Sequence, residues 1–244
     1  LTEISFDGAS VRKYRSGGRG MENVLTAEVL QGLDFLPRKP FLVAIVNALK
    51  GKNIAVAQNQ LVNEIEQAAL SLLPGPIHFK PNAPNGIGDT VNPDGILETP
   101  SLYALVEAKR IRSSSFQSQQ LAREFVVVVR EAQKQGRRPF LLLILGHEPP
   151  VSIALVGAQD IDVAIESTLK AVLRKVDSQH DFAKLSGMID ESVAWITWQM
   201  ISDILREQVT IFKASASASD TVSNAIERVA ASVINGIESH GKEQ

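Results

Sequence analysis

Residues 140–145, with the sequence FLLLIL, form a run of six consecutive apolar residues. A short apolar run of this kind is typical of a β-strand that is buried on both faces of its sheet. Such a strand needs a further layer of structure on each side, which favours a layered α/β protein. We therefore expect the other segments of the chain to form the layers that cover this strand.

Helical periodicity and chain-breaking residues predict the remaining elements. The predicted helices span residues 22–35, 41–50, 54–73, 117–135, 160–176, 182–212 and 219–238. Besides the strand at 140–145, strands are predicted within 76–98, at 102–111 and at 151–156. The predicted core order is helix, three strands, helix, strand, with helices appended at both ends. We expect three regions: a flexible arm at 1–20, a core at 21–158 and a C-terminal helical region at 159–244 packed on it.

Composition narrows the classes of function. The formal net charge is -2, so any nucleic-acid binding must depend on local basic patches. The chain has no cysteine, which excludes disulfides and thiolate metal sites. Its apolar runs are far shorter than the ~20 residues of a membrane span. The N-terminal residues contain no apolar signal-peptide core, so we expect a soluble, cytoplasmic protein.

Two short segments carry the most specific chemistry in the sequence. Glu107 and Lys109 are two residues apart in the predicted strand 102–111, and therefore project from the same face of its sheet. Asp94, which is followed by Gly95, joins them if its own strand pairs with this one. Two carboxylates can hold a hard divalent cation, and a nearby lysine can orient water or neutralise a phosphate.

The segments NPDG at 92–95 and VEAK at 106–109 resemble the PD-(D/E)XK nuclease superfamily, the fold of many restriction endonucleases. The resemblance covers residues 55–147 and implies a restriction-endonuclease-like mixed-sheet core. It implies that Asp94, Glu107 and the main-chain carbonyl of Ala108 hold Mg²⁺, with Mn²⁺ as a substitute. Lys109 would then assist the water that attacks a DNA phosphodiester.

The same resemblance implies contributions from the two flanking helices. The helix before the strands often supplies another acid, for which Glu64 and Glu66 are the candidates, with Glu64 preferred. The helix after them often turns polar side chains toward the site, which here are Gln117, Gln119 and Gln120. The implied enzyme is a Mg²⁺-dependent endodeoxyribonuclease, and cleavage of both DNA strands would require a homodimer, with the C-terminal helices as its interface.

Local groups of basic residues are candidates for DNA contact. The candidates are Arg12, Lys13, Arg15 and Arg19 in the arm, and Arg110 and Arg112 beside the proposed site. The arm could equally be plain disorder. A third group, Lys134 with Arg137 and Arg138, is explained by the preference of cations for a helix C-terminus.

Other interpretations of these residues stay open. The simplest is a surface strand with an ordinary Glu/Lys pair near an Asp-Gly turn. Among nucleases, a restriction or defence role is expected first, with DNA repair or recombination as the alternative. A non-catalytic protein that keeps the fold to bind DNA or a partner is a further class. We expect Trp195 and Trp198 to pack in the core or a dimer interface and not to stack on bases. We expect Asp89 to form a turn and not to bind a metal.

Overall fold

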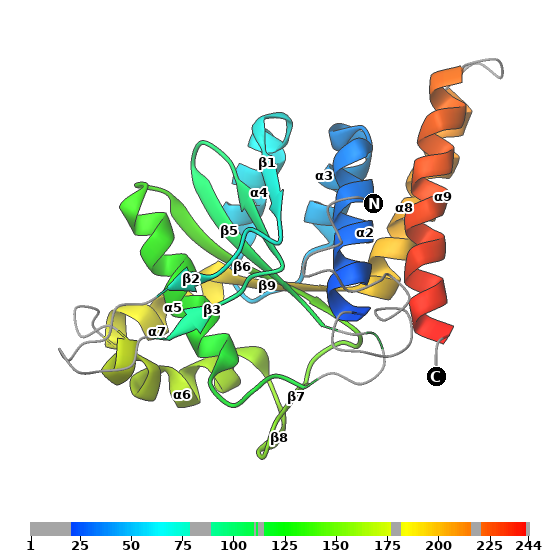
Figure 1. Cartoon of the computed structure of the whole chain (residues 1–244). Coiled ribbons are helices and arrows are strands. Elements are labelled where there is room, and N and C mark those ends of the chain that lie inside the picture. The colour runs from blue at the N-terminus through cyan, green and yellow to red at the C-terminus, as the bar shows by residue number, and fades with distance from the viewer. Residues whose placement is uncertain are drawn as a thin grey trace.

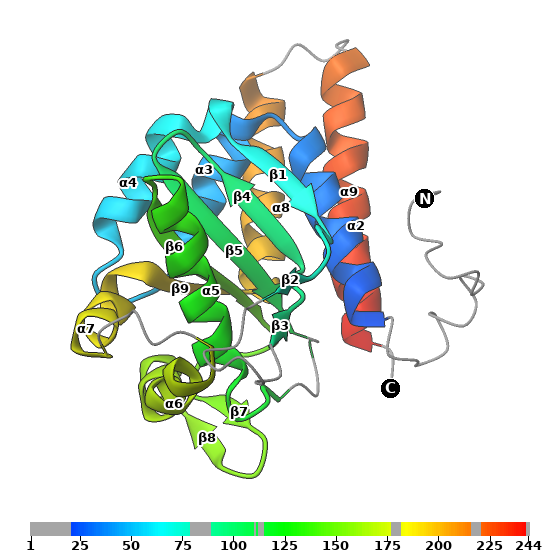
Figure 2. The ribbon, with the colours of Figure 1, turned by 60° about the vertical axis from the view of Figure 1, so that its left-hand side comes forward.

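The computed structural model describes residues 21–78, 89–109, 111, 115–176, 182–215 and 221–242. It is a mixed α/β structure in which helices cover both faces of a central sheet (Figures 1 and 2). The helices are α2 (Met21–Phe35), α3 (Arg38–Ala48), α4 (Ala55–Glu64), α5 (Gln120–Lys134), α6 (Ile161–Val176), α7 (Phe182–Ser192), α8 (Trp198–Ser215) and α9 (Thr221–Lys242). The predicted α/β class is confirmed at this level.

The central sheet has five strands in the order β1-β4-β5-β6-β9. These strands are β1 (Ala69–Leu72), β4 (Gly95–Glu98), β5 (Leu102–Ala108), β6 (Arg138–Leu145) and β9 (Val193–Thr197). The pairs β1–β4 and β4–β5 are antiparallel, whereas β5–β6 and β6–β9 are parallel. Helix α5 makes the crossover between β5 and β6, as parallel neighbours require.

Two hairpins lie outside the central sheet. One pairs β2 (Ile77–His78) with β3 (Thr90–Val91), and the other pairs β7 (Val151–Ile153) with β8 (Gly157–Gln159). The second hairpin projects from the lower side of the molecule in Figure 1. Among the described residues, no helix combines the length and the apolarity needed to cross a membrane.

The two faces of the sheet contribute to two separate hydrophobic cores. On β5, Tyr103 and Leu105 point into the core formed with α5, α6 and α7. Leu102, Ala104 and Val106 point into the opposite core, which α2, α3, α4, α8 and α9 complete. Strand β6 likewise contributes to both cores, so the prediction of a strand buried on both faces is confirmed.

Two predicted helices are wrong in part. The helix predicted at 54–73 ends at Glu64, and after the short 3₁₀ turn Ile65–Gln67 the chain forms β1, which pairs with β4. The helix predicted at 182–212 is interrupted by β9, which pairs with β6 at the edge of the sheet. In both places pairing with a neighbouring strand overrides a pattern that fits a helix, since short apolar runs suit either structure.

Candidate active site

Glu107 and Lys109 lie at the C-terminal end of β5, on the sheet face that α5 covers. Lys109 Nζ is 2.8 Å from Glu107 Oε1, and the two side chains are only 11% and 6% exposed. Lys109 Nζ also lies 5.0 Å from the centre of the Phe116 ring, within the range of a cation–π contact. Strand alternation therefore brings the two charged groups together on one face, as the sequence predicts.

The pairing of β4 with β5 places Asp94 beside this pair. Gly95 is opposite Val106 in the antiparallel register, and Asp94 N donates a hydrogen bond to Val106 O at 3.1 Å. The Asp94 side chain accepts a hydrogen bond from Ala108 N through Oδ2 at 2.8 Å, and the residue is 8% exposed. The inferred pairing of the two strands is confirmed, and it fixes Asp94 next to the backbone between Glu107 and Lys109.

Helix α5 adds two residues to this cluster. Gln120 Nε2 donates to Glu107 Oε1 at 2.7 Å and to Glu124 Oε1 at 2.8 Å. Glu124 is 2% exposed, and its Oε2 has no hydrogen-bond partner among the described residues. Burial, and secondarily the negative charge of Glu107, raises the pKa of Glu124 well above the ordinary value, against the opposing effect of Lys109. We call Asp94, Glu107, Lys109 and Glu124 the acid–lysine cluster.

The prediction that polar residues of this helix face the site did not include Glu124. Of the three glutamines it named, Gln120 contacts Glu107. Gln119 instead accepts a hydrogen bond from Lys175 Nζ, and Gln117 bonds through its backbone N–H to the Gln120 side chain. Gln120 is therefore the only one of the three for which the structure gives a contact with the cluster.

The structure does not bring Glu64 into the cluster. Glu64 Oε2 accepts a hydrogen bond from Ser101 N at 3.0 Å, just before β5 begins, whereas Glu107 lies near the other end of that strand. The reason is that α4 packs on the opposite sheet face, through residues such as Leu61. Glu66, the other candidate, is exposed in the 3₁₀ turn. The expected third acid thus does not come from α4, and Glu124 of α5 is the acid found nearest the predicted residues.

The main chain at Lys109 is held from two sides. Lys109 N donates to Ile144 O of β6 at 2.8 Å, and Lys109 O accepts a hydrogen bond from Trp198 Nε1 at 2.7 Å. Trp198 is 1% exposed at the start of α8, so its expected packing role is confirmed and includes a polar contact. This arrangement fixes the backbone from which the lysine side chain projects.

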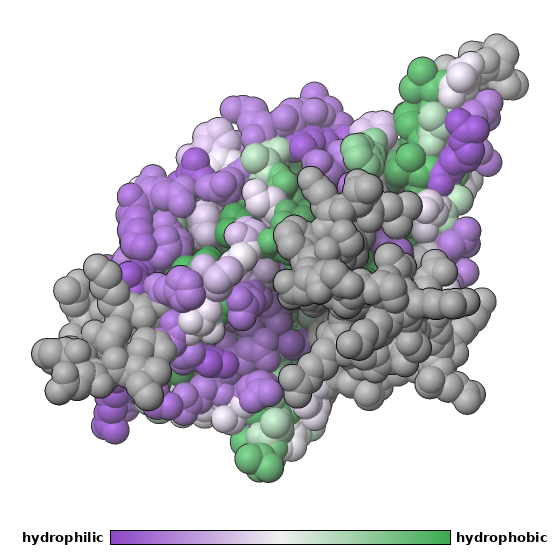
Figure 3. Space-filling model, in the orientation of Figure 1, coloured by the Kyte–Doolittle hydropathy of each residue, from purple (hydrophilic) through white to green (hydrophobic). Residues whose placement is uncertain are grey.

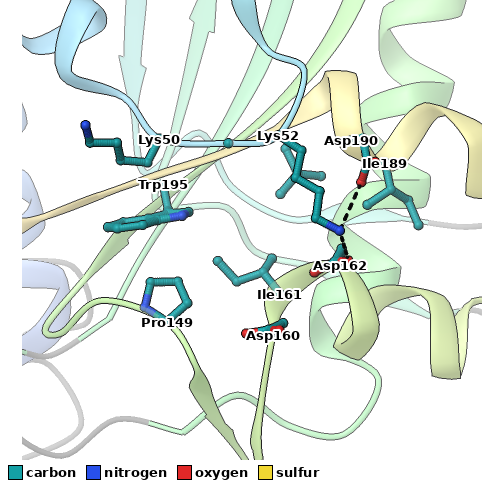
Figure 4. Close-up of a pocket in the computed structure, with 11 residues that line it drawn as sticks. Lys50, Lys52, Pro149, Asp160, Ile161, Asp162, Ile189, Asp190 and Trp195 are labelled. Carbon is teal, nitrogen blue, oxygen red and sulfur yellow. Dashed lines mark hydrogen bonds and ion pairs between the residues drawn. The ribbon is translucent and has the colours of Figure 1, made fainter.

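Trp195 has different surroundings from Trp198. It lines a cavity of about 340 Å³ together with Lys50, Pro149 and Asp160 (Figure 4). Lys52 Nζ spans the far side of this cavity, 2.5 Å from Asp162 and 3.8 Å from Asp190. These ion pairs join the loop after α3 to α6 and α7, so we assign the cavity wall a structural role and place the site at the acid–lysine cluster.

Other charged candidates are engaged in ion pairs. Asp89, which was considered as a metal ligand, forms an ion pair with Arg123 at 2.9 Å. Arg137 pairs with Glu98 at 2.7 Å, and Arg138 lies 3.7 Å from Glu191. The predicted DNA contacts at Arg12, Lys13, Arg15, Arg19, Arg110 and Arg112 lie outside the described residues.

The donor set of the cluster suits a hard divalent cation. Across the described ranges, no group of three or more His, Asp or Glu side chains is arranged as a ready-made metal site. Asp94 and Glu107 nevertheless offer oxygen ligands, and the buried Glu124 Oε2 accepts no hydrogen bond from the residues that the structure describes. Comparison of the chain with protein-family models, curated proteins and solved structures found no match. The fold and the site thus define a mixed α/β protein with a buried acid–lysine cluster.

Proposed function

We propose that this protein is a metal-dependent DNA endonuclease with a restriction-endonuclease-like core. The observation that carries the proposal is the meeting of Asp94, Glu107 and Lys109 at one end of β5. The order α4, β1, β4, β5, α5, β6, which leaves out the separate β2–β3 hairpin, supports it, since the resemblance implies a core of helix, three strands, helix and strand. Two consecutive strands, β4 and β5, thereby bring the three residues of the motif together.

Asp94, Glu107 and the Ala108 carbonyl are the proposed ligands of Mg²⁺, with Mn²⁺ as a substitute. A bound divalent cation stabilises negative charge on a phosphate and makes its water more acidic than bulk water. The cluster itself supports this assignment: Asp94, Glu107 and Glu124 are three carboxyl groups around one lysine. When ionised, such a set repels a phosphate group unless a further cation offsets its charge.

The proposed roles of the other residues follow from their contacts. Lys109 is held against Phe116 and beside Glu107, where its ammonium group can neutralise the phosphate or position the attacking water. Gln120 ties Glu107 to Glu124 and so fixes the rotamer of the proposed ligand. Glu124 has a raised pKa and therefore holds a proton to higher pH than an ordinary glutamate, so that approach of a cation would favour release of that proton.

DNA is the proposed substrate, and the cytoplasm is the proposed location. The proposed active form is a homodimer, because two sites are needed to cut the two strands of a duplex. Helices α8 and α9 carry exposed apolar residues, among them Ile211 and Val222, that suit a dimer interface. A restriction or defence role is the first biological assignment, since many members of the superfamily are restriction endonucleases. DNA repair or recombination, and non-catalytic binding of DNA or a partner, are the alternatives.

Plasmid cleavage tests the proposal directly. Supercoiled plasmids of varied sequence are incubated with the protein in Mg²⁺ or Mn²⁺, and nicked and linear products are measured. We expect cleavage that a chelator stops and that Lys109→Ala lowers by about 10²- to 10⁴-fold. Lys134→Ala is the matched control, because Lys134 is an exposed lysine that pairs with Glu131 on α5. If the wild-type protein leaves all plasmids intact in both metals, the nuclease proposal is rejected.

A further inference from the structure

The β7–β8 hairpin ends in an exposed apolar tip. Strands β7 and β8 pair from Val151 opposite Gln159 to Ile153 opposite Gly157, and residues 154–156 form the turn. Leu155 in this turn is fully exposed, and Val156 is 55% exposed. Figure 3 shows a hydrophobic patch at the lower end of the molecule, where Figure 1 places this hairpin. We call residues 154–156 the apolar finger.

Neither turn geometry nor packing accounts for the leucine. Leu155 has φ 68°, in the left-handed region that glycine and asparagine adopt most readily. Turns commonly place Gly, Asn or Asp at such positions, because a larger side chain is strained there. A fully exposed leucine gains no burial in the protein that would offset this strain. A strained residue without a local benefit points to a functional role.

The finger is joined to the acid–lysine cluster through Phe116. Phe116 N donates to Ser152 O at 2.9 Å, and Ala154 N donates to Phe116 O at 2.8 Å. The ring of Phe116 in turn lies under the Lys109 ammonium group. Val151 and Ile153 anchor the base of the hairpin in the core beneath α5. These contacts give the hairpin a fixed position relative to Lys109.

The chemistry of the finger indicates which part of a nucleic acid it would contact. Residues 139–169 contain no lysine or arginine, so this segment is unsuited to binding phosphates. The carboxylates of Asp160 and Asp162, which follow the hairpin, are likewise unsuited to binding phosphates. Apolar side chains of DNA-binding proteins instead insert between base pairs and unstack one step. We propose that the finger inserts Leu155 into the base stack of a DNA duplex at the acid–lysine cluster; this inference rests on the proposed function.

The test compares binding to duplexes that are easy or hard to unstack. Full-length protein carrying Lys109→Ala, which prevents cleavage, is titrated in Mg²⁺ with a fluorescent matched duplex and with the same duplex containing one mismatch. We expect roughly tenfold tighter binding to the mismatched duplex, because its base step opens at lower cost. Adding Leu155→Asn, which is compatible with the left-handed backbone, should abolish this preference. Phe35→Ala, at an exposed apolar residue on α2, should preserve it.

A 2-aminopurine base placed beside the mismatch gives a second measurement, since its fluorescence rises when it is unstacked. The rise should occur with Leu155 and be absent with Leu155→Asn. If Leu155→Asn changes neither the preference nor the fluorescence, the finger proposal is overturned while plasmid cleavage can still support the nuclease. If Leu155→Asn alters only self-association in sedimentation, the finger is a protein contact and the proposal is likewise overturned. If neither duplex binds and no plasmid is cut, both proposals fail.

Discussion

A glutamate of an adjacent helix lies near each end of β5, and the pKa values of the two glutamates are shifted in opposite directions. At the start of the strand, Glu64 accepts a hydrogen bond from Ser101 N, and hydrogen bonding, chiefly with Thr99, lowers the pKa of Glu64. At the end of the strand, burial and the neighbouring Glu107 raise the pKa of Glu124. The charged form of Glu64 is therefore stabilised, whereas the charged form of Glu124 is destabilised.

This difference separates a structural acid from a candidate functional one. Glu64 has donors for its charge and helps fix the turn between β4 and β5. Glu124 shares its surroundings with two other acids, and one of its oxygens has no donor among the described residues. Groups of acids that raise one another's pKa are typical of sites that bind cations or transfer protons. The comparison therefore favours the end of β5, and not its start, as the place of chemistry.

The largest expected effect distinguishes the two ends by cleavage. Glu107→Gln should lower plasmid cleavage by about 10²- to 10⁴-fold, because it removes a proposed charged ligand. Glu64→Gln should leave the cleavage rate of the folded protein unchanged. It should lower the free energy of unfolding by about 1 kcal/mol, since a neutral acceptor replaces a charged one at Ser101 N. Plasmid assays and urea unfolding measure the two effects.

A loss of cleavage caused by the other glutamate would contradict this assignment. Should Glu64→Gln abolish cleavage in a protein that unfolds at the same urea concentration as the wild type, the chemistry would belong at the start of β5. Equal losses of cleavage in both variants would show that the two ends act as one unit.

An intermediate effect is expected from the tryptophan that holds the end of the strand. Trp198→Phe removes the hydrogen bond to Lys109 O and leaves a buried acceptor, which should cost about 1–3 kcal/mol of unfolding free energy. Cleavage should fall about tenfold as Lys109 loses its fixed position. Trp195→Phe is the matched control on the cavity wall and should cost less than about 1.5 kcal/mol without a change in cleavage. An equal loss of cleavage in both variants would contradict the positioning role of Trp198.

The smallest effect concerns pH. Because the pKa of Glu124 is raised in the folded protein, its contribution to metal-free stability is fully present below the ordinary value of 4.5. That contribution is lost as the pH rises from 4.5 through the raised pKa, since the unfolded chain ionises first. Urea unfolding of the metal-free protein at several pH values should show this decline, and Glu124→Gln should flatten it. A decline of the same slope in Glu124→Gln would assign the titration to another group.

Much of the site follows from simple periodicity in the sequence. Alternation along a strand places Glu107 and Lys109 on one face, and the Asp-Gly step at residues 94–95 precedes a strand that pairs with theirs. The six apolar residues of 140–145 correctly predict a strand covered by two layers. These features depend on local pattern and on neighbours close in sequence, which is why one sequence suffices to predict them.

Glu124 was missed although the sequence contains a signal for it. It lies three residues after Leu121 and four before Val128, both buried, so helical spacing puts it on the apolar side of α5. An acid on the apolar side of a helix is costly without a partner, but the resemblance implied that the further acid comes from the preceding helix. Strand β9 is harder to predict from the sequence. Residues 193–197 join two helices without Gly or Pro, and they form a strand because they pair with β6.

Helices α2 and α9, the first and last of the described chain, pack side by side (Figures 1 and 2). They approach so closely at Gly32 that an added Cβ would lie 2.2 Å from Val233 Cγ2. During synthesis α2 emerges early and its apolar residues, such as Val29, lack this partner until α9 has been made. Since β9 also enters the sheet late, folding of the core depends on contacts that span nearly the whole chain, and such topologies form slowly. Apolar surface of α2 therefore stays exposed until α9 has been made, and incompletely folded species of this kind are prone to aggregate.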